Sequence, residues 1–269
     1  MNLLVASLVG LTLLSGPNDA RHSVTAIVQK IERADYEGDR AALKLLHDEL
    51  APFVADHELG ARVLYWRGFS LWRRSLNGFN EDADRKELED DLRQCVVDFK
   101  EAWARDPGLL DAKGGAASCL VNHSFLIMSS DRAGSRQMFQ ESATLLDEAL
   151  AGSPDNPRLL WVQGTNEFYG RENGAQDRAI ATYERGLALA RKQKSGTADP
   201  LDPAWGEPEL LMNLAFANLH KTAPDLDAAN SYAQNALLLV PYWHYVRDIL
   251  LVQIQKARAA RPSTVENPR

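Results

Sequence analysis

Histidines, cysteines and a run of acidic side chains are the residues of this chain whose types could support chemistry. No two histidines have the spacing of four residues, with a glutamate between them, that places zinc ligands on one face of a helix. The six are His22, His47, His57, His123, His220 and His244. We interpret them as polar surface or lining residues, and two cysteines alone do not make a zinc site.

The acidic side chains gather between Glu81 and Asp91, in the stretch EDADRKELEDD. Paired carboxylates can act as general acid and base, or bind calcium in a loop of the right spacing. No EF-hand spacing is present, and the period of a helix distributes these side chains over several faces. We therefore interpret the stretch as the solvated beginning of a helix, where acidic residues interact favourably with the helix dipole.

Familiar sequence motifs of catalysis are missing. The chain contains no G-x-S-x-G nucleophile motif, no G-x-x-x-x-G-K phosphate loop and no dinucleotide-binding fingerprint. We expect no catalytic residue, no metal and no cofactor, and hence a protein that is not an enzyme. A weaker alternative stays open: an enzyme on a helical scaffold, which histidines and carboxylates converging in one pocket would reveal.

The elements that would position any site are amphipathic helices in pairs. Between Leu159 and Arg191, apolar residues recur at helical spacing in two stretches, separated by the turn dipeptide Asn173-Gly174. Small residues at Gly164 and Gly186 let two helix backbones approach closely. Neither helix can bury its apolar stripe alone, so the pair must stack on neighbouring pairs.

This pattern resembles the tetratricopeptide repeat (TPR). The residues that carry the resemblance are Trp161, Gly164 or Thr165, Phe168, Ala179, Tyr183 and Gly186. Residues 60–107, 109–154 and 207–241 repeat the pattern, with Cys95, Phe99, Ala102 and Pro107 matching the second-helix signature in the first of them. The resemblance implies an all-α, TPR-like α-solenoid of stacked antiparallel helix pairs with a concave groove. A degenerate pair at 24–53 would precede it, and a C-terminal capping helix at 242–260 would end it.

The N-terminus reads as a secretory signal peptide. An apolar run from Leu3 to Leu14 is followed by Ser15-Gly16-Pro17, and Ala20 offers a small residue for cleavage. The run is too short for a stable membrane anchor. We expect a signal peptide at 1–20, a helical-repeat domain at 21–260 and a disordered tail at 261–269, in a protein that is periplasmic or secreted. The alternative is that the run forms a buried N-terminal helix.

Charge narrows the class of partner. The 269 residues carry a formal net charge of −7. A nucleic-acid binder needs a basic face, and a membrane-surface module needs a polybasic segment, so we expect neither. The two cysteines, Cys95 and Cys119, fall on adjacent repeats. They would form a disulfide in an oxidising compartment, or they are two small buried residues at helix contacts.

In the TPR family the first helix of each unit lines the concave groove. Transferring this by spacing gives the candidate groove residues Arg62, Tyr65, Phe69, Trp72, Arg73, Asn122, Asn166, Tyr169, Phe216 and His220. Aromatic residues and arginine are enriched in binding hot spots, although some of these side chains could instead pack between units. The Lys–Asn pattern by which some family members hold a peptide carboxylate is not matched.

Two functions follow from these observations. The first is a non-catalytic, exported scaffold that binds a protein or peptide in its concave groove. The second is a periplasmic small-molecule binding component associated with a solute transporter. An open groove would favour the first, and an enclosed cavity lined by aromatic residues such as Trp72, Tyr169 and Phe216 would favour the second.

Overall fold

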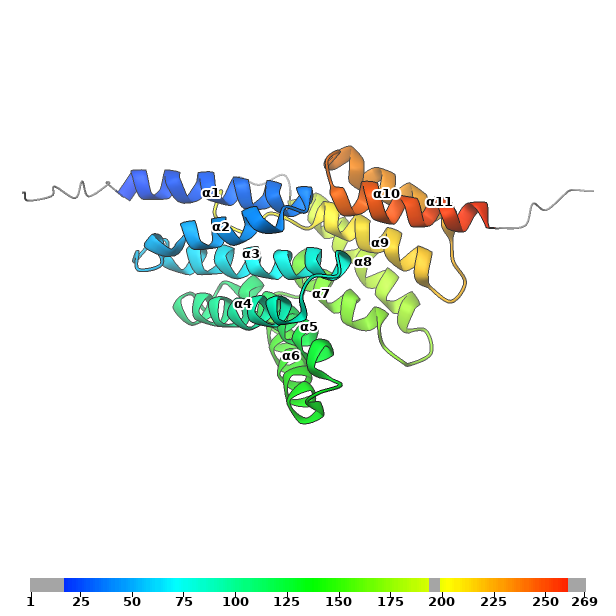
Figure 1. Ribbon diagram of the computed structural model, residues 1–269, viewed down its shortest axis with the longest axis horizontal. Coiled ribbons are helices and arrows are strands. Elements are labelled where there is room, and N and C mark those ends of the chain that lie inside the picture. Colours follow the sequence, from blue (N-terminus) through cyan, green and yellow to red (C-terminus); the bar gives the residue numbers. More distant parts are fainter. Residues whose placement is uncertain (1–16, 194–198, 261–269) are drawn as a thin grey trace, which may run out of the picture.

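The computed structural model describes residues 17–193 and 199–260, and over these residues it contains helices and no strand. The helices follow one another as antiparallel pairs (Figure 1). The pairs are α1 (Pro17–Glu37) with α2 (Arg40–Glu49), α3 (Gly60–Asn80) with α4 (Arg85–Arg105), α5 (Leu110–Ile127) with α6 (Arg132–Gly152), α7 (Pro157–Phe168) with α8 (Ala175–Gln193), and α9 (Glu207–His220) with α10 (Leu226–Leu239). The prediction of an all-α solenoid is confirmed.

Two short segments interrupt this regularity. A 3₁₀ turn, η1 (Ala51–Phe53), follows α2, and a π-helical segment, η2 (Tyr245–Leu250), leads directly into α11 (Leu251–Ala259). The predicted capping helix at 242–260 is therefore a π-helical turn continued by an α-helix. It packs on α10, as a terminal cap of a solenoid does.

The helices form two layers. Each first helix contacts the first helix of the next pair, so that α1, α3, α5, α7 and α9 make an inner layer. Their partners α2, α4, α6, α8 and α10 cover the outside. Short polar side chains begin most of the second helices: Asp39, Asp84, Asp131 and Asp225 each accept a hydrogen bond from a backbone N–H of the first turn.

Two glycines allow the close approach within pairs that the sequence predicts. A Cβ atom on Gly164 would lie 2.5 Å from Cε1 of Tyr183, and one on Gly68 would lie 2.9 Å from the ring of Phe99. In both cases an aromatic ring of the second helix fills the space over a glycine of the first helix. The small residue and the aromatic residue of the repeat are thus two halves of one contact.

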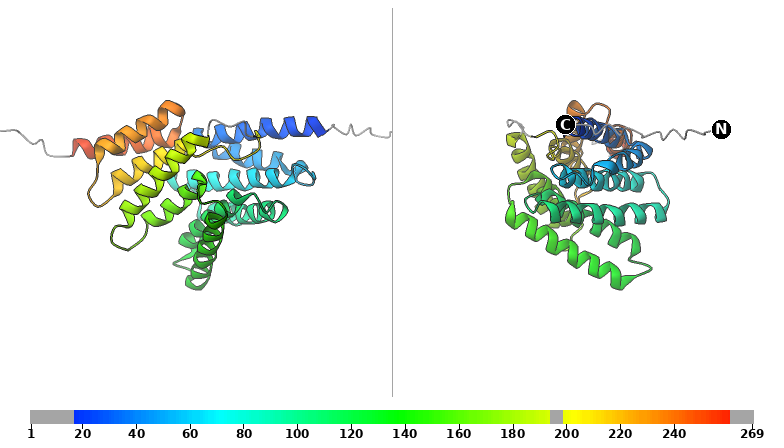
Figure 2. Two further views of the ribbon diagram at one scale, coloured as in Figure 1. Left: turned by 180° about the vertical axis from the view of Figure 1, so that it is seen from behind. Right: turned by 90° about the vertical axis from the view of Figure 1, so that its left-hand side faces the viewer.

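The first helix also reaches the last unit. Tyr36 of α1 packs edge-to-face against Trp243 at a centroid separation of 4.9 Å and donates a hydrogen bond to Glu209 of α9. The guanidinium of Arg33 lies 5.2 Å from the ring centre of Tyr242. Figures 1 and 2 show α1 close to the C-terminal helices. The stack therefore closes on itself instead of remaining an open arc.

The segment between α8 and α9 enters the concave side. Leu201 and Trp205 are 1% and 7% exposed. Trp66 donates a hydrogen bond from Nε1 to the carbonyl of Leu201, and Trp205 donates one from Nε1 to the hydroxyl of Tyr65. The proline and glycine residues of this segment are typical of a linker between units, but its described part, from residue 199, supplies side chains to the core.

As a result, three predicted groove residues lie in the core. Tyr65, Phe69 and Trp72 are each 1% exposed, and Trp205 packs against Phe69 and Trp72 with ring centres 5.8 and 5.7 Å apart. The prediction that these three side chains contact a partner in the groove is wrong, because the closed stack and residues of the chain itself cover them.

The acidic stretch is more than a solvated helix start. Asp84 caps α4 as expected, but Asp91 is 5% exposed. Asp91 and Glu87 form ion pairs with Arg74 of α3, and Glu87 also pairs with Arg40 of α2. The interpretation as a solvated stretch is wrong for these two carboxylates, which join three helices.

The termini and the surface complete the description. The predicted signal peptide lies largely outside the described residues, and the predicted tail lies wholly outside them. Helix α1 begins at Pro17, so cleavage near Ala20 would remove its first turn.

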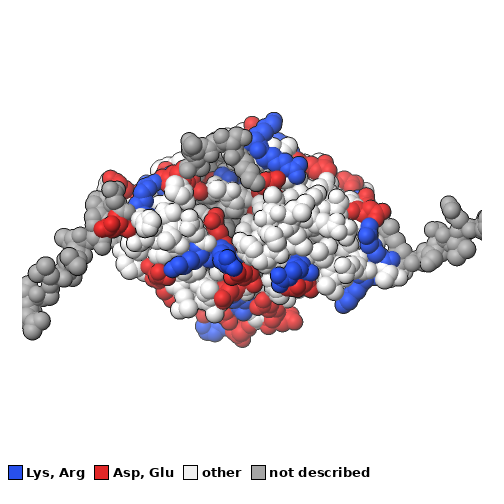
Figure 3. Space-filling model, turned by 90° about the horizontal axis from the view of Figure 1, so that it is seen from above, with Lys and Arg blue, Asp and Glu red and all other residues white. Residues whose placement is uncertain are grey.

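Among the described helices, none is long and apolar enough to cross a membrane. On the face shown in Figure 3, acidic and basic side chains are interspersed, and no broad basic area is visible there.

Candidate functional site

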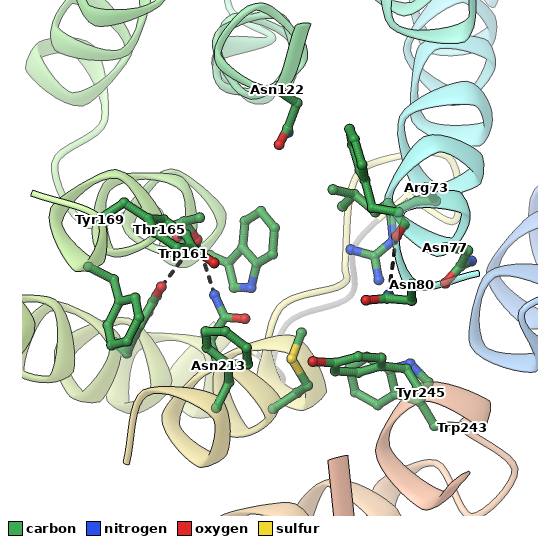
Figure 4. A pocket seen from close by; sticks show the side chains of 16 residues that line it. Arg73, Asn77, Asn80, Asn122, Trp161, Thr165, Tyr169, Asn213, Trp243 and Tyr245 are labelled. Atoms are coloured by element: carbon green, nitrogen blue, oxygen red, sulfur yellow. Dashed lines mark hydrogen bonds between the residues drawn. The ribbon is translucent and has the colours of Figure 1, made fainter. Parts of the chain in front are cut away.

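A pocket of about 290 Å³ lies on the concave side, and we call it the central pocket (Figure 4). Side chains from both ends of the solenoid line it. They are Arg73, Leu76, Asn77, Phe79 and Asn80 of α3, Asn122 of α5, Trp161, Thr165, Phe168 and Tyr169 at α7, Tyr183 of α8, Met212, Asn213 and Phe216 of α9, and Trp243 and Tyr245 of the C-terminal cap. The pocket is thus built mainly by the inner layer, with further side chains from α8 and from the cap.

The walls of the pocket combine aromatic rings with neutral polar groups. Phe168 packs edge-to-face on Phe216 with ring centres 5.6 Å apart. On the same side, the hydroxyl of Tyr183 donates to Thr165 Oγ1 at 3.2 Å, and Asn213 Nδ2 donates to the same oxygen at 3.1 Å. These bonds tie α7, α8 and α9 together at the pocket and hold their side chains in one arrangement.

Trp161 presents an unused hydrogen-bond donor. Its side chain is buried, and its Nε1 atom has no hydrogen-bond partner among the described residues. Figure 4 shows its indole projecting into the pocket. Trp72 has a similar unpartnered Nε1 but is not part of the pocket lining. A buried donor without an acceptor is costly, so an acceptor supplied by a ligand would stabilise the Trp161 side chain.

Arg73 is the one charged side chain among the described residues that line the pocket. It is 4% exposed, and its Nε atom donates a hydrogen bond of 2.7 Å to Asp35 of α1. Burial lowers the pKa of Arg73, but the carboxylates of Asp35 and Glu209 more than compensate, so the net shift is upward and the guanidinium stays charged. Figure 4 shows its terminal nitrogens facing the pocket.

Behind Arg73, acidic residues hold the charge balance. Tyr36 and the backbone N–H of Gly206 donate to the two carboxylate oxygens of Glu209 at 2.7 and 2.8 Å. Burial, and next the carboxylates of Glu209 and Asp35, raise the pKa of Glu32 to about 7. Because Asp35 pairs with Arg73 and Glu209 lies close by, the positive charge of the guanidinium is already compensated before any ligand arrives.

The titratable side chains of the pocket lining are one arginine and three tyrosines. They are Arg73, Tyr169, Tyr183 and Tyr245, and none of the described lining residues is a histidine, cysteine or carboxylate. Within residues 17–193 and 199–260, no three such side chains gather as a metal site would require. The pocket offers hydrogen bonds, aromatic surface and shape, which are the means of binding.

Four of the predicted groove residues line the central pocket: Arg73, Asn122, Tyr169 and Phe216. Arg62 lies near the opposite end of α3, where it pairs with Asp106 and Asp202. Asn166 and His220 are outside the lining, although the ring of His220 packs on Phe216 with centres 4.3 Å apart.

The sequence did not single out several lining residues as binding groups. Trp161 and Tyr183 were recognised only as repeat positions. The dipeptide Asn77-Gly78 locally indicates the end of a helix, yet α3 continues to Asn80 and brings both asparagines to the pocket. Trp243 and Tyr245 belong to the cap, and only the closure of the stack places them opposite α3.

Cys95 of α4 and Cys119 of α5 form a disulfide with Cα atoms 6.6 Å apart. Both residues are fully buried between adjacent repeats. Of the two interpretations left open, burial at a helix contact and disulfide bonding, the structure has both at once. Neither cysteine lines the central pocket, so the bridge acts on the scaffold.

Comparison with known proteins shows the fold. No family model and no curated protein sequence matches the chain. Among solved structures, it is similar to a thermophilic TPR protein of Thermus thermophilus, with a TM-score of 0.57 and 20% sequence identity. The similarity covers 89% of this chain and 99% of that one. The repeat signature, the stacked helix pairs and this structural similarity agree, and the chain has a TPR-like helical-repeat fold.

Proposed function

We propose that this chain is a non-catalytic binding protein that holds a small solute in the central pocket. The observation that carries the proposal is the closure of the stack. With Tyr36 on Trp243 and Trp205 among the core aromatics, the concave side retains a pocket of about 290 Å³. That volume lies at the lower end of the range of small-molecule sites.

The chemistry of the lining supports a solute more than an extended peptide. A peptide laid along a TPR groove would need the first-helix side chains along its length to be exposed. Tyr65, Phe69 and Trp72 of α3 are instead covered, which removes their part of that surface. The aromatic lining fits the small-molecule alternative in part: Tyr169 and Phe216 line the pocket as expected, Trp161 lines it as well, and Trp72 does not.

The test is native mass spectrometry of the full chain purified without denaturation, followed by identification of any released compound. Asn122→Trp would fill the pocket, because Asn122 is a half-buried lining residue that bonds only within its own helix. Asn166→Trp, at a half-buried position outside the lining, is the matched control. A solute carried by the wild type and by N166W but not by N122W is the expected result; equal loading of all three proteins would refute the proposal.

A protein partner is the second candidate, and one observation favours it. Phe79 and Tyr169 line the pocket yet are 37% and 61% exposed, so they form an apolar rim that a partner could contact. In-cell crosslinking with Tyr169→Ala tests this candidate. A protein captured by the wild type and lost in the variant would support it, whereas an unchanged crosslinking pattern would count against it.

Export belongs to the same proposal. The apolar run at residues 3–14 and a disulfide between buried cysteines both support an oxidising compartment. Mass determination of the mature protein from its native host would show an N-terminus near residue 21 if the signal peptide is removed. Transfer of the solute to a transporter remains a further prediction of this proposal.

A further inference from the structure

The polar groups of the central pocket are mainly neutral amides. Asn77 and Asn80 of α3, Asn122 of α5 and Asn213 of α9 all line it. Each uses its Nδ2 group for a hydrogen bond to a neighbouring group of the protein, which fixes the amide in place. Over the described residues, no donor reaches the Oδ1 atoms of these four side chains, so acceptors from three helices remain for a ligand.

Hydrogen-bond donors without a protein partner also line the central pocket. Trp161 Nε1 has no acceptor among the described residues, and the guanidinium of Arg73 bonds to Asp35 only through Nε, which leaves its terminal N–H groups. The ring of Tyr245 carries a hydroxyl group for which the described residues provide no hydrogen bond, and Figure 4 shows it toward the middle of the pocket. A ligand that pairs with these groups must both donate and accept hydrogen bonds, and it must do so at several positions.

The charge balance disfavours an ionised ligand. Asp35 already compensates Arg73 at 2.7 Å, and Glu209, whose pKa burial raises, lies close by. An anionic ligand would place a further negative charge beside these groups in a buried site, where repulsion is weakly screened. A cationic ligand would meet no carboxylate among the described lining residues and would face Arg73 instead. A neutral ligand avoids both costs.

Aromatic rings supply the remaining surface. Trp161, Phe168, Tyr183 and Trp243 are buried rings at the pocket, and Phe216 and Tyr245 are partly buried ones. Ring faces pack well against the weakly polar C–H groups of a saturated ring. Hydroxyl groups on such a ring each donate and accept, which matches amide oxygens on one side and indole and guanidinium N–H groups on the other.

We propose that the central pocket binds a neutral mono- or disaccharide, with Trp161 Nε1 and the asparagine amides as partners of its hydroxyl groups. This inference rests on the proposed function, namely that the pocket holds a small solute. The pocket volume of about 290 Å³ has room for a ligand of one or two rings and excludes a long oligosaccharide.

The test is isothermal titration of the full chain with two sets of probes. The neutral set is glucose, galactose, mannose, N-acetylglucosamine, maltose, sucrose and trehalose. The charged set is glucuronate, benzoate, phenylacetate and choline. We expect at least one neutral saccharide to bind with a Kd below 10 mM, on the order of the weakest affinity that this titration resolves, and to bind more tightly than every charged probe.

Two variants connect that binding to named atoms. Trp161→Phe removes the Nε1 donor and keeps an aromatic ring, and we expect it to weaken the saccharide about tenfold, the effect of one hydrogen bond to a buried group. Asn122→Leu removes an amide and should weaken binding by a similar factor. Trp103→Phe and Asn166→Leu, which change the same residue types outside the pocket, should leave the Kd unchanged.

Three results would overturn the inference. The first is that no neutral saccharide binds at 10 mM, a concentration of about the weakest Kd considered above. The second is that a charged probe binds most tightly, and the third is that W161F and N122L leave saccharide binding unchanged. These failures are separate from failure of the proposed function. If native mass spectrometry recovers a charged solute that N122W loses, the pocket is a solute site and only the saccharide assignment is wrong. If no solute is recovered and no probe binds, both fall.

Discussion

The hydroxyl of Tyr36 donates a hydrogen bond of 2.7 Å to Glu209, joining residues that are 173 positions apart in the sequence. Tyr36 belongs to the first helix and Glu209 to the last helix pair. Glu209 is 1% exposed and receives its other hydrogen bond from the backbone of Gly206. One side chain therefore fixes both the closure of the stack and the entry of the preceding segment into the core.

Loss of the Tyr36 hydroxyl should weaken this closure. We expect Tyr36→Phe to lower the free energy of unfolding by about 1–3 kcal/mol, because the buried Glu209 carboxylate loses a donor while the aromatic packing on Trp243 remains. Urea denaturation followed by tryptophan fluorescence measures this change. Tyr232→Phe, which removes a longer and more exposed bond of 3.4 Å to Glu184, serves as the control and should change stability by less.

The stability of the closed form should depend on pH through Glu32. Burial, followed by Glu209 and Asp35, raises its pKa from the ordinary 4.5 to about 7. The folded state then holds this proton more tightly than the unfolded chain does, so the group favours folding below about pH 4.5 and that contribution is lost as the pH rises to about 7.

We therefore expect Glu32→Gln to be more stable than the wild type above pH 7, by about 1–3 kcal/mol. The difference should shrink as the pH falls toward 4.5, the ordinary value for the side chain. Denaturation midpoints of both proteins across this range provide the measurement, with exposed Glu58→Gln as the control. A difference that is constant with pH would show that Glu32 titrates normally.

A methyl group at Gly164 should be poorly tolerated. Its Cβ atom would lie 2.5 Å from the ring of Tyr183, within a contact that also positions Thr165 at the pocket. Overpacking of this kind costs about 1–3 kcal/mol, and we expect Gly164→Ala to lower the melting temperature accordingly. Adding Tyr183→Leu should recover part of the loss, since the smaller side chain makes room. No recovery in the double variant would place the strain elsewhere.

Removal of the disulfide should lower stability without changing the pocket. Cys95 and Cys119 join α4 to α5 across a sequence separation of 24 residues. We expect the double substitution to Ser to lower the free energy of unfolding by about 2–4 kcal/mol. A reductant should destabilise the wild type and leave the double variant unaffected, and equal sensitivity of the two proteins would mean that the bridge is not formed in solution.

The local pattern of the sequence predicts much of the scaffold. The helical period of the apolar residues and the placement of small residues identify the helix pairs, and Gly164 has the close contact expected of it. These features are predictable because each repeat has the same short-range task, which is to bury one stripe against its neighbours. The same reasoning identifies Asn122, Tyr169 and Phe216 as concave residues, and they line the pocket.

The errors come from long-range contacts. Nothing near Tyr65 indicates that Trp205, 140 residues later, will donate a hydrogen bond to it and cover it. Trp205 stands in a stretch rich in proline and glycine, which locally indicates a linker. Likewise, Tyr245 becomes a lining residue only because the last helices meet the first. A repeat pattern predicts the contacts between adjacent repeats, whereas the lining of the pocket depends on contacts between the two ends of the array.

The contact between the first and last units also fixes the number of repeats. In an open solenoid a unit can be inserted or deleted, because each repeat contacts only those beside it. Here an added repeat would rotate α9 away from α1 and separate Tyr36 from Glu209 and Trp243. We therefore expect homologous proteins to differ in their loops and in single side chains of the pocket. The number of helix pairs should stay the same.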